Sequence, residues 1–158
     1  MSSVIRAWAA RIETPLGPMR ARGSDSLNSL DFDEAVEAVS DDPLALRLQQ
    51  EMDEYFAGSR HEFSIPLAPQ GTEFQQIIWR MVALVPWGAT KSYSEIAREL
   101  GDVQKTRSVG AAVGANPILI LIPCHRIVAM DGELTGYSGG ILRKQALLEL
   151  ESGQGALF

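Results

Sequence analysis

The stretch Ile118-Leu119-Ile120-Leu121-Ile122-Pro123-Cys124-His125-Arg126-Ile127-Val128 places the chain's single cysteine beside one of its two histidines, at the end of an apolar run. The run is too short to cross a bilayer, and its isoleucine-rich composition predicts a buried strand or extended segment. We therefore expect a well-packed interior segment that ends at Cys124, with polar residues directly after it. Such a segment is a suitable mount for a nucleophile, and we expect the chemistry of the protein here.

Length and composition are those of an ordinary globular protein. The 158 residues, 46% hydrophobic and 22% charged, suffice for one or two small domains with a packed core. Neither a signal-peptide pattern nor an apolar run of about 18 residues is found, so we expect no membrane partner and a cytoplasmic location, or a nuclear one in a eukaryote. With one cysteine and two histidines, we expect a free thiol and no metal site.

The formal net charge of −6 is unevenly distributed along the chain. Residues 1–71 hold six Lys or Arg and twelve Asp or Glu, whereas residues 72–126 hold six and four. Residues 127–158 hold two and four. The small cationic surplus in the middle supports salt-sensitive phosphate contacts but not tight electrostatic binding. Any affinity for nucleic acid must therefore come largely from shape.

Residues 1–63 are predicted to form a small α/β domain. Helical spacing of apolar residues predicts a helix over residues 44–56, and the acidic stretch 33–42 is expected to be weakly helical. The turn Thr14-Pro15-Leu16-Gly17-Pro18 predicts a hairpin between the first two of three strands. The three strands are expected at residues 4–12, 18–23 and 27–32.

A linker is predicted at residues 64–71, which contain two prolines and a glycine, and residues 72–158 form the predicted second domain. Thr72 is a good N-cap for a helix over 73–85. A Ser-x-x-Glu capping box beginning at Ser92 starts a short helix that ends at Gly101. A further helix over 105–114 completes a pattern typical of a helix-turn-helix in a mainly α domain.

Two glycines in that last helix need an explanation. Gly110 and Gly114 each cost about 1 kcal/mol of helix propensity relative to alanine. Tight helix–helix packing inside the protein is one gain that could offset this cost. A helix whose backbone presses into a narrow groove is the other, and local features alone favour the first slightly.

Several ordered motifs together resemble the O6-alkylguanine-DNA alkyltransferase family, also called methylated-DNA-protein-cysteine methyltransferases. The resemblance covers roughly residues 71–151 and includes the spacing from Asn116 to Cys124 and from Cys124 to Glu151. The hairpin near Thr14 also resembles the start of the family's smaller N-terminal domain. The motifs are Lys91-Ser92-Tyr93-Ser94-Glu95-Ile96-Ala97, Arg107-Ser108-Val109-Gly110, Asn116-Pro117-Ile118, Pro123-Cys124-His125-Arg126 and Gly136-Tyr137-Ser138-Gly139-Gly140.

The resemblance implies a fold and a reaction. The fold would be a small ribonuclease-H-like α/β domain joined to a mainly α, winged-helix-like domain with a helix-turn-helix. The reaction would be irreversible transfer of a methyl or other alkyl group from O6 of guanine, and by extension O4 of thymine, to Cys124. The partner would be double-stranded DNA containing O6-alkylguanine, without a cofactor. One transfer per molecule is expected, by a monomer that could bind DNA cooperatively.

The thiol of Cys124 needs activation by a neighbouring residue. A free cysteine has a pKa near 8.5, so Cys124 needs a base or a positive neighbour to react at neutral pH. Neighbours on a strand point to opposite faces, so His125 reaches Cys124 only through a turn or a water molecule. The resemblance implies the water, with Glu151 orienting the other nitrogen of His125.

The remaining site residues are assigned by resemblance. Tyr93 would donate a hydrogen bond to the leaving purine and Asn116 would buttress the site loops. Arg107 would fill the gap left by a flipped guanine while its helix lies in the minor groove. The pocket would be lined by Tyr93, Ile122, Pro123, Tyr137 and Ser138. The DNA-binding set would be Ser92, Lys105, Thr106, Arg107, Ser108, Gly110, Ala111 and Arg126.

Three other functions compete with this interpretation. A non-catalytic alkyltransferase-like DNA binder would lack the reactive cysteine. A helix-turn-helix regulator would not need the Cys-His pair and would more often carry a stronger basic surplus. A thiol hydrolase would use Cys124, His125 and Glu151 but would leave Arg107 and Tyr93 without roles.

Overall fold

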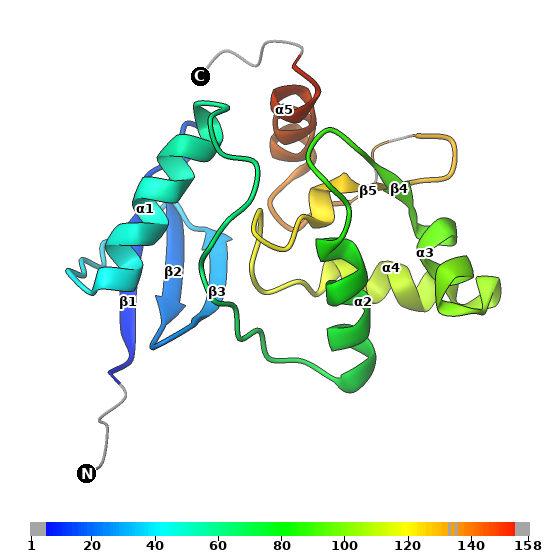
Figure 1. Cartoon of the computed structure of the whole chain (residues 1–158), viewed down its shortest axis with the longest axis horizontal. Helices are drawn as coiled ribbons and strands as arrows, with labels where there is room; N and C mark the ends of the chain where they lie inside the picture. Colours follow the sequence, from blue (N-terminus) through cyan, green and yellow to red (C-terminus); the bar gives the residue numbers. More distant parts are fainter. Residues whose placement is uncertain (1–5, 133, 135, 154–158) are drawn as a thin grey trace. The chain divides into compact units, whose positions relative to one another are not determined.

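The computed structural model describes residues 6–132, 134 and 136–153, and the chain divides into two compact units between Gln70 and Gly71. Figure 1 shows the order of the elements along the chain. We call the described residues up to Gln70 unit 1 and those from Gly71 onward unit 2. The exact bounds of the predicted linker, 64–71, stay a prediction.

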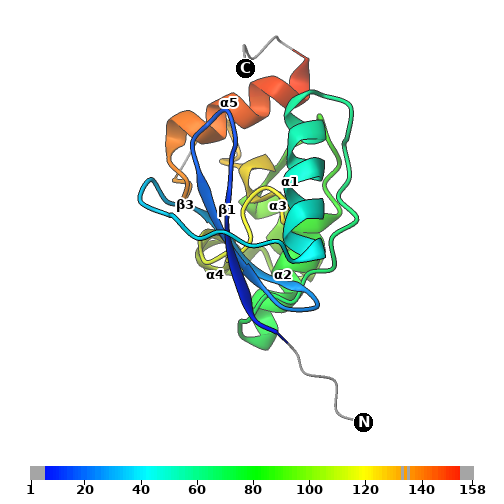
Figure 2. The ribbon, with the colours of Figure 1, turned by 90° about the vertical axis from the view of Figure 1, so that its left-hand side faces the viewer.

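Unit 1 is an antiparallel sheet with strand order β1-β2-β3 and one helix, α1. α1 runs beside β1 (Figures 1 and 2), and Asp42 caps it by accepting a hydrogen bond from the Leu44 amide at 2.9 Å. Completely buried side chains of the sheet and of α1 form the core, among them Ile12, Met19 and Leu48. The bounds are β1 Trp8–Ile12, β2 Met19–Gly23, β3 Leu27–Phe32 and α1 Pro43–Phe56.

The expectation of a weak helix over residues 33–42 is wrong. The segment makes a turn after Asp33 and then runs along the edge of β1, where the Arg11 amide donates to the Ala38 carbonyl at 2.9 Å. Across the sheet, the Leu27 amide donates to Pro66 at 2.8 Å, so β3 is also partly covered. Both sheet edges thus find backbone partners, a gain that outweighs the weak helical preference of an acidic segment.

Unit 2 is mainly helical. Thr72 and Ser92 both form complete capping boxes, and Gly101 ends α3 with φ of +105°, a conformation in which glycine is favoured. Trp79 on α2 donates from its indole to the Ala112 carbonyl on α4 at 2.8 Å. The bounds are α2 Glu73–Ala83, β4 Lys91–Ser92, α3 Tyr93–Leu100, η1 Val103–Lys105, α4 Thr106–Gly114, η2 Cys124–Arg126, β5 Ile127–Val128 and α5 Ile141–Ser152.

These elements confirm the predicted fold class, an antiparallel sheet with a helix followed by a mainly helical domain. α3 and α4, joined through Gly101 and η1, form the predicted helix-turn-helix. The first strand begins at Trp8 within the described residues, and positions 4 and 5 of its predicted range lie outside them. None of the helices in the described ranges is long and apolar enough to cross a membrane.

The buried strand or extended segment expected over the apolar run is confirmed in its burial, but residues 119–126 form no strand. These residues are buried but follow a series of tight turns, and only Ile127 and Val128 pair, in parallel, with β4. Ile120 has φ of +72° and is bridged by a hydrogen bond from the Leu121 amide to the Leu119 carbonyl, a strained γ-turn for a β-branched residue. A short apolar run predicts burial, but it cannot distinguish a strand from a packed irregular segment.

Candidate active site in unit 2

A tight turn presents the thiol. Pro123, with φ −81° and ψ 60°, is the centre of an inverse γ-turn in which the Cys124 amide donates to the Ile122 carbonyl at 2.7 Å. The proline ring fixes φ near the value this turn needs. Cys124 then begins the short helix η2, and only 3% of its surface is exposed. The nucleophile predicted from the sequence therefore lies in an enclosed, rigid position.

Asn116 is hydrogen bonded to the thiol and to the turn that carries it. Its Nδ2 donates to Cys124 Sγ at 3.0 Å and to the Ile122 carbonyl at 2.8 Å. Its Oδ1 accepts from the Ile118 amide at 2.9 Å. One amide group thus ties both ends of the apolar segment together and stabilises negative charge on the sulfur.

Glu151 lies against His125, as the predicted relay requires. Oε2 of Glu151 is 2.7 Å from His125 Nε2, and Oε1 accepts from Arg126 Nε at 2.7 Å. Arg126 Nη1 donates to the Val85 carbonyl at 2.7 Å. Burial raises the pKa of the Glu151 carboxyl, but the hydrogen bonds from His125 and Arg126 outweigh it and bring this pKa to about 2. Glu151 is therefore ionised at neutral pH.

The ionised carboxylate decides which nitrogen of His125 carries the proton. Burial lowers the pKa of His125 more than Glu151 raises it, so the ring is neutral at neutral pH. A carboxylate only accepts hydrogen bonds, so Nε2 must hold the proton and Nδ1 must present a lone pair. Nδ1 is buried and has no hydrogen-bond partner among the described residues. His125 is thus a base with its reactive nitrogen available.

Lys144 is a residue of the site that the sequence motifs do not reveal. Its side chain is completely buried, and Nζ donates to the Ile127 carbonyl at 2.7 Å and lies 6.0 Å from the centre of the Tyr93 ring. Burial raises the pKa of Cys124 to about 11, and the bond from Asn116 and the charge of Lys144 partly oppose this rise. The signal was present, because Lys144, Leu147 and Glu151 share one face of α5.

Two residues predicted to bind DNA lie in the interior instead. Arg126 is 6% exposed and its guanidinium is bound to Glu151 and Val85, which leaves it unsuited to a phosphate contact. Ser92 is 4% exposed, and its hydroxyl accepts from the Glu95 amide at 3.0 Å as the N-cap of α3. Charge and sequence position alone do not separate a surface arginine from one that neutralises a buried carboxylate.

The other predicted DNA-binding residues lie on η1 and α4, and most of them are accessible. Lys105, Arg107, Ser108 and Ala111 are exposed, whereas Thr106 and Gly110 are half-buried. A Cβ at Gly110 would meet the Tyr93 ring at 3.8 Å, an ordinary contact, and a Cβ at Gly114 would meet nothing within 4 Å. Packing inside the chain therefore does not require either glycine, which removes the interpretation that local features favoured.

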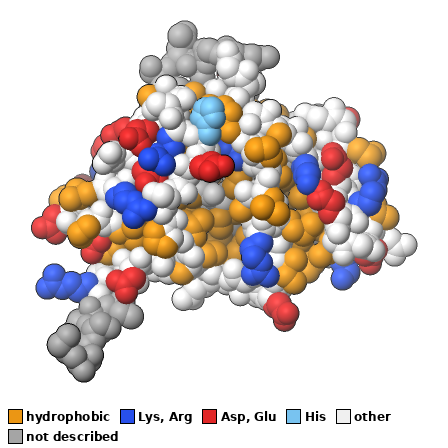
Figure 3. Space-filling view, viewed as in Figure 1, with side chains coloured by type: hydrophobic (Ala, Val, Ile, Leu, Met, Phe, Trp, Pro, Cys, Tyr) orange, Lys and Arg blue, Asp and Glu red, His pale blue; other side chains and the backbone are white. Residues whose placement is uncertain are grey.

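The residues of the predicted pocket come from three segments of unit 2. Ile122 and Pro123 are buried in the turn that precedes it, and Tyr93 is the first residue of α3. Ser138 is exposed, next to a half-buried Tyr137 whose hydroxyl is buried. On the face shown in Figure 3, charges of both signs are interspersed and no single basic patch stands out.

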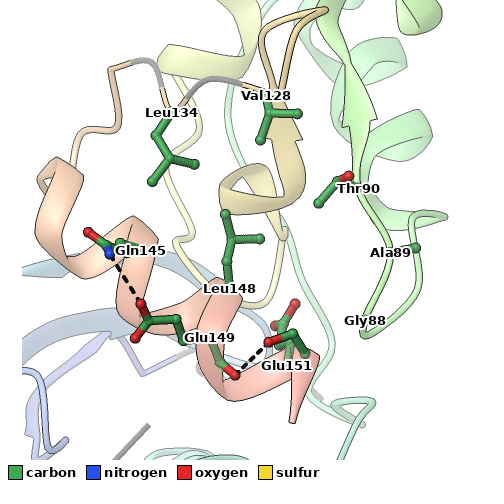
Figure 4. A pocket seen from close by; sticks show the side chains of 11 residues that line it. Gly88, Ala89, Thr90, Val128, Leu134, Gln145, Leu148, Glu149 and Glu151 are labelled. Atoms are coloured by element: carbon green, nitrogen blue, oxygen red, sulfur yellow. Dashed lines mark hydrogen bonds between the residues drawn. The ribbon is translucent and has the colours of Figure 1, made fainter. Parts of the chain in front are cut away.

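A cavity of 330 Å³ lies beside the last turns of α5 and is lined by Glu151 but not by Cys124 (Figure 4). Thr90, Val128, Leu148 and Glu149 also line it. Glu149 accepts a hydrogen bond from Gln145 at 3.1 Å within it. The described residues contain no cluster of three or more His, Cys, Asp or Glu side chains that could hold a metal.

Two family models cover most of the chain. Residues 10–69 match the ribonuclease-like domain of 6-O-methylguanine DNA methyltransferase, and residues 73–153 match its DNA-binding domain. The chain belongs to the 6-O-methylguanine DNA methyltransferase family. The resemblance inferred from the ordered motifs is thereby confirmed.

Relatives and solved structures agree with this family. The chain is 43% identical over 150 residues to the methylated-DNA–protein-cysteine methyltransferase of Mycobacterium tuberculosis, covering 90% of this chain and 91% of that protein. It is 36% identical to the enzyme of the same name from Methanosarcina acetivorans, covering 91% and 97%.

The crystal structure of Mycobacterium tuberculosis O6-methylguanine methyltransferase matches with a TM-score of 0.85 at 38% identity, covering 95% of each chain. A structure of Mycobacterium tuberculosis OGT in complex with DNA matches with a TM-score of 0.82 at 42% identity, covering 91% of this chain and 92% of that one.

Proposed function

We propose that the protein repairs alkylated DNA by moving the alkyl group from O6 of guanine to the sulfur of Cys124. The observation that carries the proposal is the buried contact between Glu151 and His125, the residue that follows Cys124 in the chain, in a member of the methylated-DNA–protein-cysteine methyltransferase family. The thiolate forms a bond to the alkyl carbon while the bond from that carbon to O6 breaks. Guanine keeps the electron pair and takes up a proton, so the reaction balances without a cofactor.

The thiol reacts only after it loses its proton. With a pKa of about 11 in its buried position, Cys124 is protonated at neutral pH and needs a base. His125 Nδ1 is that base, and a water molecule between the two carries the proton from sulfur to nitrogen. Asn116 and Lys144 then stabilise the thiolate, through a hydrogen bond and a positive charge respectively.

The product explains why each molecule acts once. A thioether has no good leaving group at sulfur, so water does not remove the alkyl group from Cys124. The protein is therefore consumed one molecule per lesion. Tyr93 assists the forward reaction by donating a hydrogen bond to the purine as negative charge develops on it.

α4 is the proposed DNA-contacting element. Apart from Arg107, its exposed residues are small, and packing within the chain does not require Gly110 and Gly114, so a narrow external groove is the remaining reason for these glycines. Arg107 is exposed on α4 and fills the space left by the flipped guanine. The structure of Mycobacterium tuberculosis OGT in complex with DNA supports DNA as the partner.

The scope of the reaction follows from the same site. We propose O6-alkylguanine in duplex DNA as the main substrate and O4-alkylthymine as a second one, acted on by a monomer that could bind DNA cooperatively. The relatives are bacterial and archaeal, and we propose the cytoplasm, where such cells keep their DNA, as the place of action.

Incubation with excess duplex DNA carrying one O6-methylguanine tests the function. We expect the Cys124 peptide to gain one CH2 group in mass, the lesion to become guanine, and the reaction to stop after one equivalent. A Cys124→Ser variant is the control and should leave the lesion unchanged. Repeated turnover, or methyl on another residue, would disprove the proposed reaction.

Replacement of Arg107 by alanine tests base flipping. The rate on duplex DNA should fall at least about tenfold, because Arg107 offsets part of the few kcal/mol that unstacking a base costs. The rate on free O6-benzylguanine should hardly change, because that base need not be unstacked. Arg80→Ala, which removes an exposed arginine from α2, is the matched control. Equal losses of rate on both substrates would contradict the proposal that Arg107 fills the space left by the flipped guanine.

A further inference from the structure

Two buried side-chain atoms among the described residues lack a hydrogen-bond partner. One is Nδ1 of His125 and the other is the hydroxyl oxygen of Tyr137. Buried polar groups are nearly always paired with protein or with ordered water, so each unpaired one indicates a partner that the fold is built to receive. The first has a role in the proposed reaction, but the hydroxyl of Tyr137 has none so far.

Tyr137 is fixed at the entrance to α5. The Gly140 amide donates to the Tyr137 carbonyl at 2.8 Å, and this turn leads directly into the helix that carries Lys144 and Glu151. Burial raises the pKa of Tyr137 well above 10, and the charges of Cys124 and Glu151 raise it further. The hydroxyl therefore lies within the electrostatic reach of the thiol and stays protonated at all pH values at which the protein would work.

We propose that the hydroxyl of Tyr137 is the third partner of the water that carries the proton from Cys124 to His125. The inference rests on the proposed function, because it assigns a holder to the water in that relay. A buried water typically makes about three hydrogen bonds, and the thiol and Nδ1 provide two. Tyr137 is one of only two described residues with an unpaired buried polar atom, and the other is the base itself.

A hydroxyl suits this position because it both donates and accepts. Before transfer, the water accepts from the thiol S–H and donates to Nδ1, and its second hydrogen or its second lone pair can bond to Tyr137. The proton then leaves sulfur for water while another leaves water for Nδ1, so the number of protons is conserved. The hydroxyl keeps its bond throughout, which fixes the water on the line between thiol and base. Tyr137 is thus a positioning residue that acts through the relay.

Tyr137→Phe removes the hydroxyl and keeps the ring. We expect the first-order rate of methyl transfer from O6-methylguanine DNA to fall roughly three- to tenfold, the effect of losing one hydrogen bond. The same factor should appear in the alkylation of Cys124 by iodoacetamide, which contains no purine. Tyr55→Phe, a change of the same kind in the core of unit 1, should leave both rates within about twofold. A Tyr137→Phe rate within twofold of wild type would overturn the proposal.

A double-mutant cycle separates the relay from packing or substrate contact. If Tyr137 acts through His125, the loss caused by Tyr137→Phe in the iodoacetamide reaction should vanish in a His125→Ala background. An equal loss in both backgrounds would overturn the inference while leaving methyl transfer by the wild type untouched. Failure of the wild type to accept methyl at Cys124 would instead disprove the proposed function, so the two failures are distinguishable.

Discussion

Among the described residues, each unit contains one buried glutamate that arginine neutralises, and the two glutamates differ in their other partners. Glu51 in unit 1 and Glu151 in unit 2 are each 4% exposed. Glu51 accepts from the Ser64 amide at 2.8 Å and from Arg47 Nε at 3.3 Å. Glu151 accepts from Arg126 but also lies 2.7 Å from a histidine that has a free nitrogen on its other side.

A buried carboxylate neutralised by arginine thus has a structural role in unit 1 and a chemical one in unit 2. The partners of Glu51 are the amide and the hydroxyl of Ser64 and two partly exposed arginines, so its charge only fixes the segment at Ser64 to α1. The charge of Glu151 acts on the imidazole of His125, where it sets the tautomer of the base that follows Cys124 in the chain. A buried carboxylate becomes part of a site when its partner has a second atom that can do chemistry.

Replacing each glutamate by glutamine should give the largest contrast. In Glu151→Gln the side chain can donate to His125 and favour the wrong tautomer, so the single-turnover rate of methyl transfer should fall about a thousandfold. In Glu51→Gln the rate should stay within about twofold, although stability falls by about 1–3 kcal/mol. Comparable rate losses in both variants would show that Glu151 is only structural.

The loss of folding stability at low pH is the second difference that we expect between Glu151 and Glu51. The folded pKa of Glu151 is about 2 against an ordinary 4.5, so its contribution is fully present above pH 4.5 and is lost as the pH falls through 2. The Ser64 bonds and the arginines also lower the pKa of Glu51, although burial opposes them. Urea unfolding between pH 2 and 7 should show a loss of roughly 3 kcal/mol that Glu151→Gln largely abolishes. An unchanged pH dependence in that variant would contradict the assignment.

Removing a cation near the thiol and removing one beside Glu51 should give rates of methyl transfer that differ by about tenfold. Lys144→Met removes a positive charge near the thiol, which raises the pKa of Cys124 further and should slow methyl transfer about tenfold at neutral pH. Arg60→Met removes a cation from the Glu51 cluster and should leave the rate unchanged. The loss in Lys144→Met should shrink at alkaline pH, where hydroxide forms the thiolate directly. A loss that is constant with pH would argue for packing instead.

Helix caps should give the smallest difference. Asp42→Ala in unit 1 and Ser92→Ala in unit 2 each remove an N-cap hydrogen bond, so each should cost about 1 kcal/mol in urea unfolding. Neither should change the affinity for duplex DNA. If Ser92→Ala weakens DNA binding well beyond Asp42→Ala, the sequence-based assignment of Ser92 to the DNA contact would be restored.

Much of the fold could be predicted because local signals agreed with the tertiary structure. The capping boxes at Thr72 and Ser92 and the αL glycine at Gly101 mark helix ends by themselves. The turns between Ile118 and Cys124 could not be predicted, because their shape depends on long-range packing and on Asn116 bonds to both ends of the segment. An apolar run predicts that a segment is buried, but it does not predict whether its backbone forms a strand or a series of turns.

The site was predicted where function needs a rare residue and missed where it needs a common one. Cys124 and His125 stand out because the chain has so few of either. Arg126 and Lys144 are ordinary charges whose burial depends on the position of Glu151, so their roles emerge only when α5 is placed. Its sequence position suggests a phosphate contact for Arg126, whereas in the folded chain its guanidinium is bound to the carboxylate of Glu151.

The protonation state of the His125 ring tests the central claim, that Glu151 fixes His125 as a base with Nδ1 free. In ¹⁵N NMR spectra of labelled protein at neutral pH, the two histidines can be assigned with a His61→Gln variant. We expect a neutral His125 with a proton on Nε2 and none on Nδ1, and loss of this preference in Glu151→Gln. A ring protonated on Nδ1, or on both nitrogens, would contradict it.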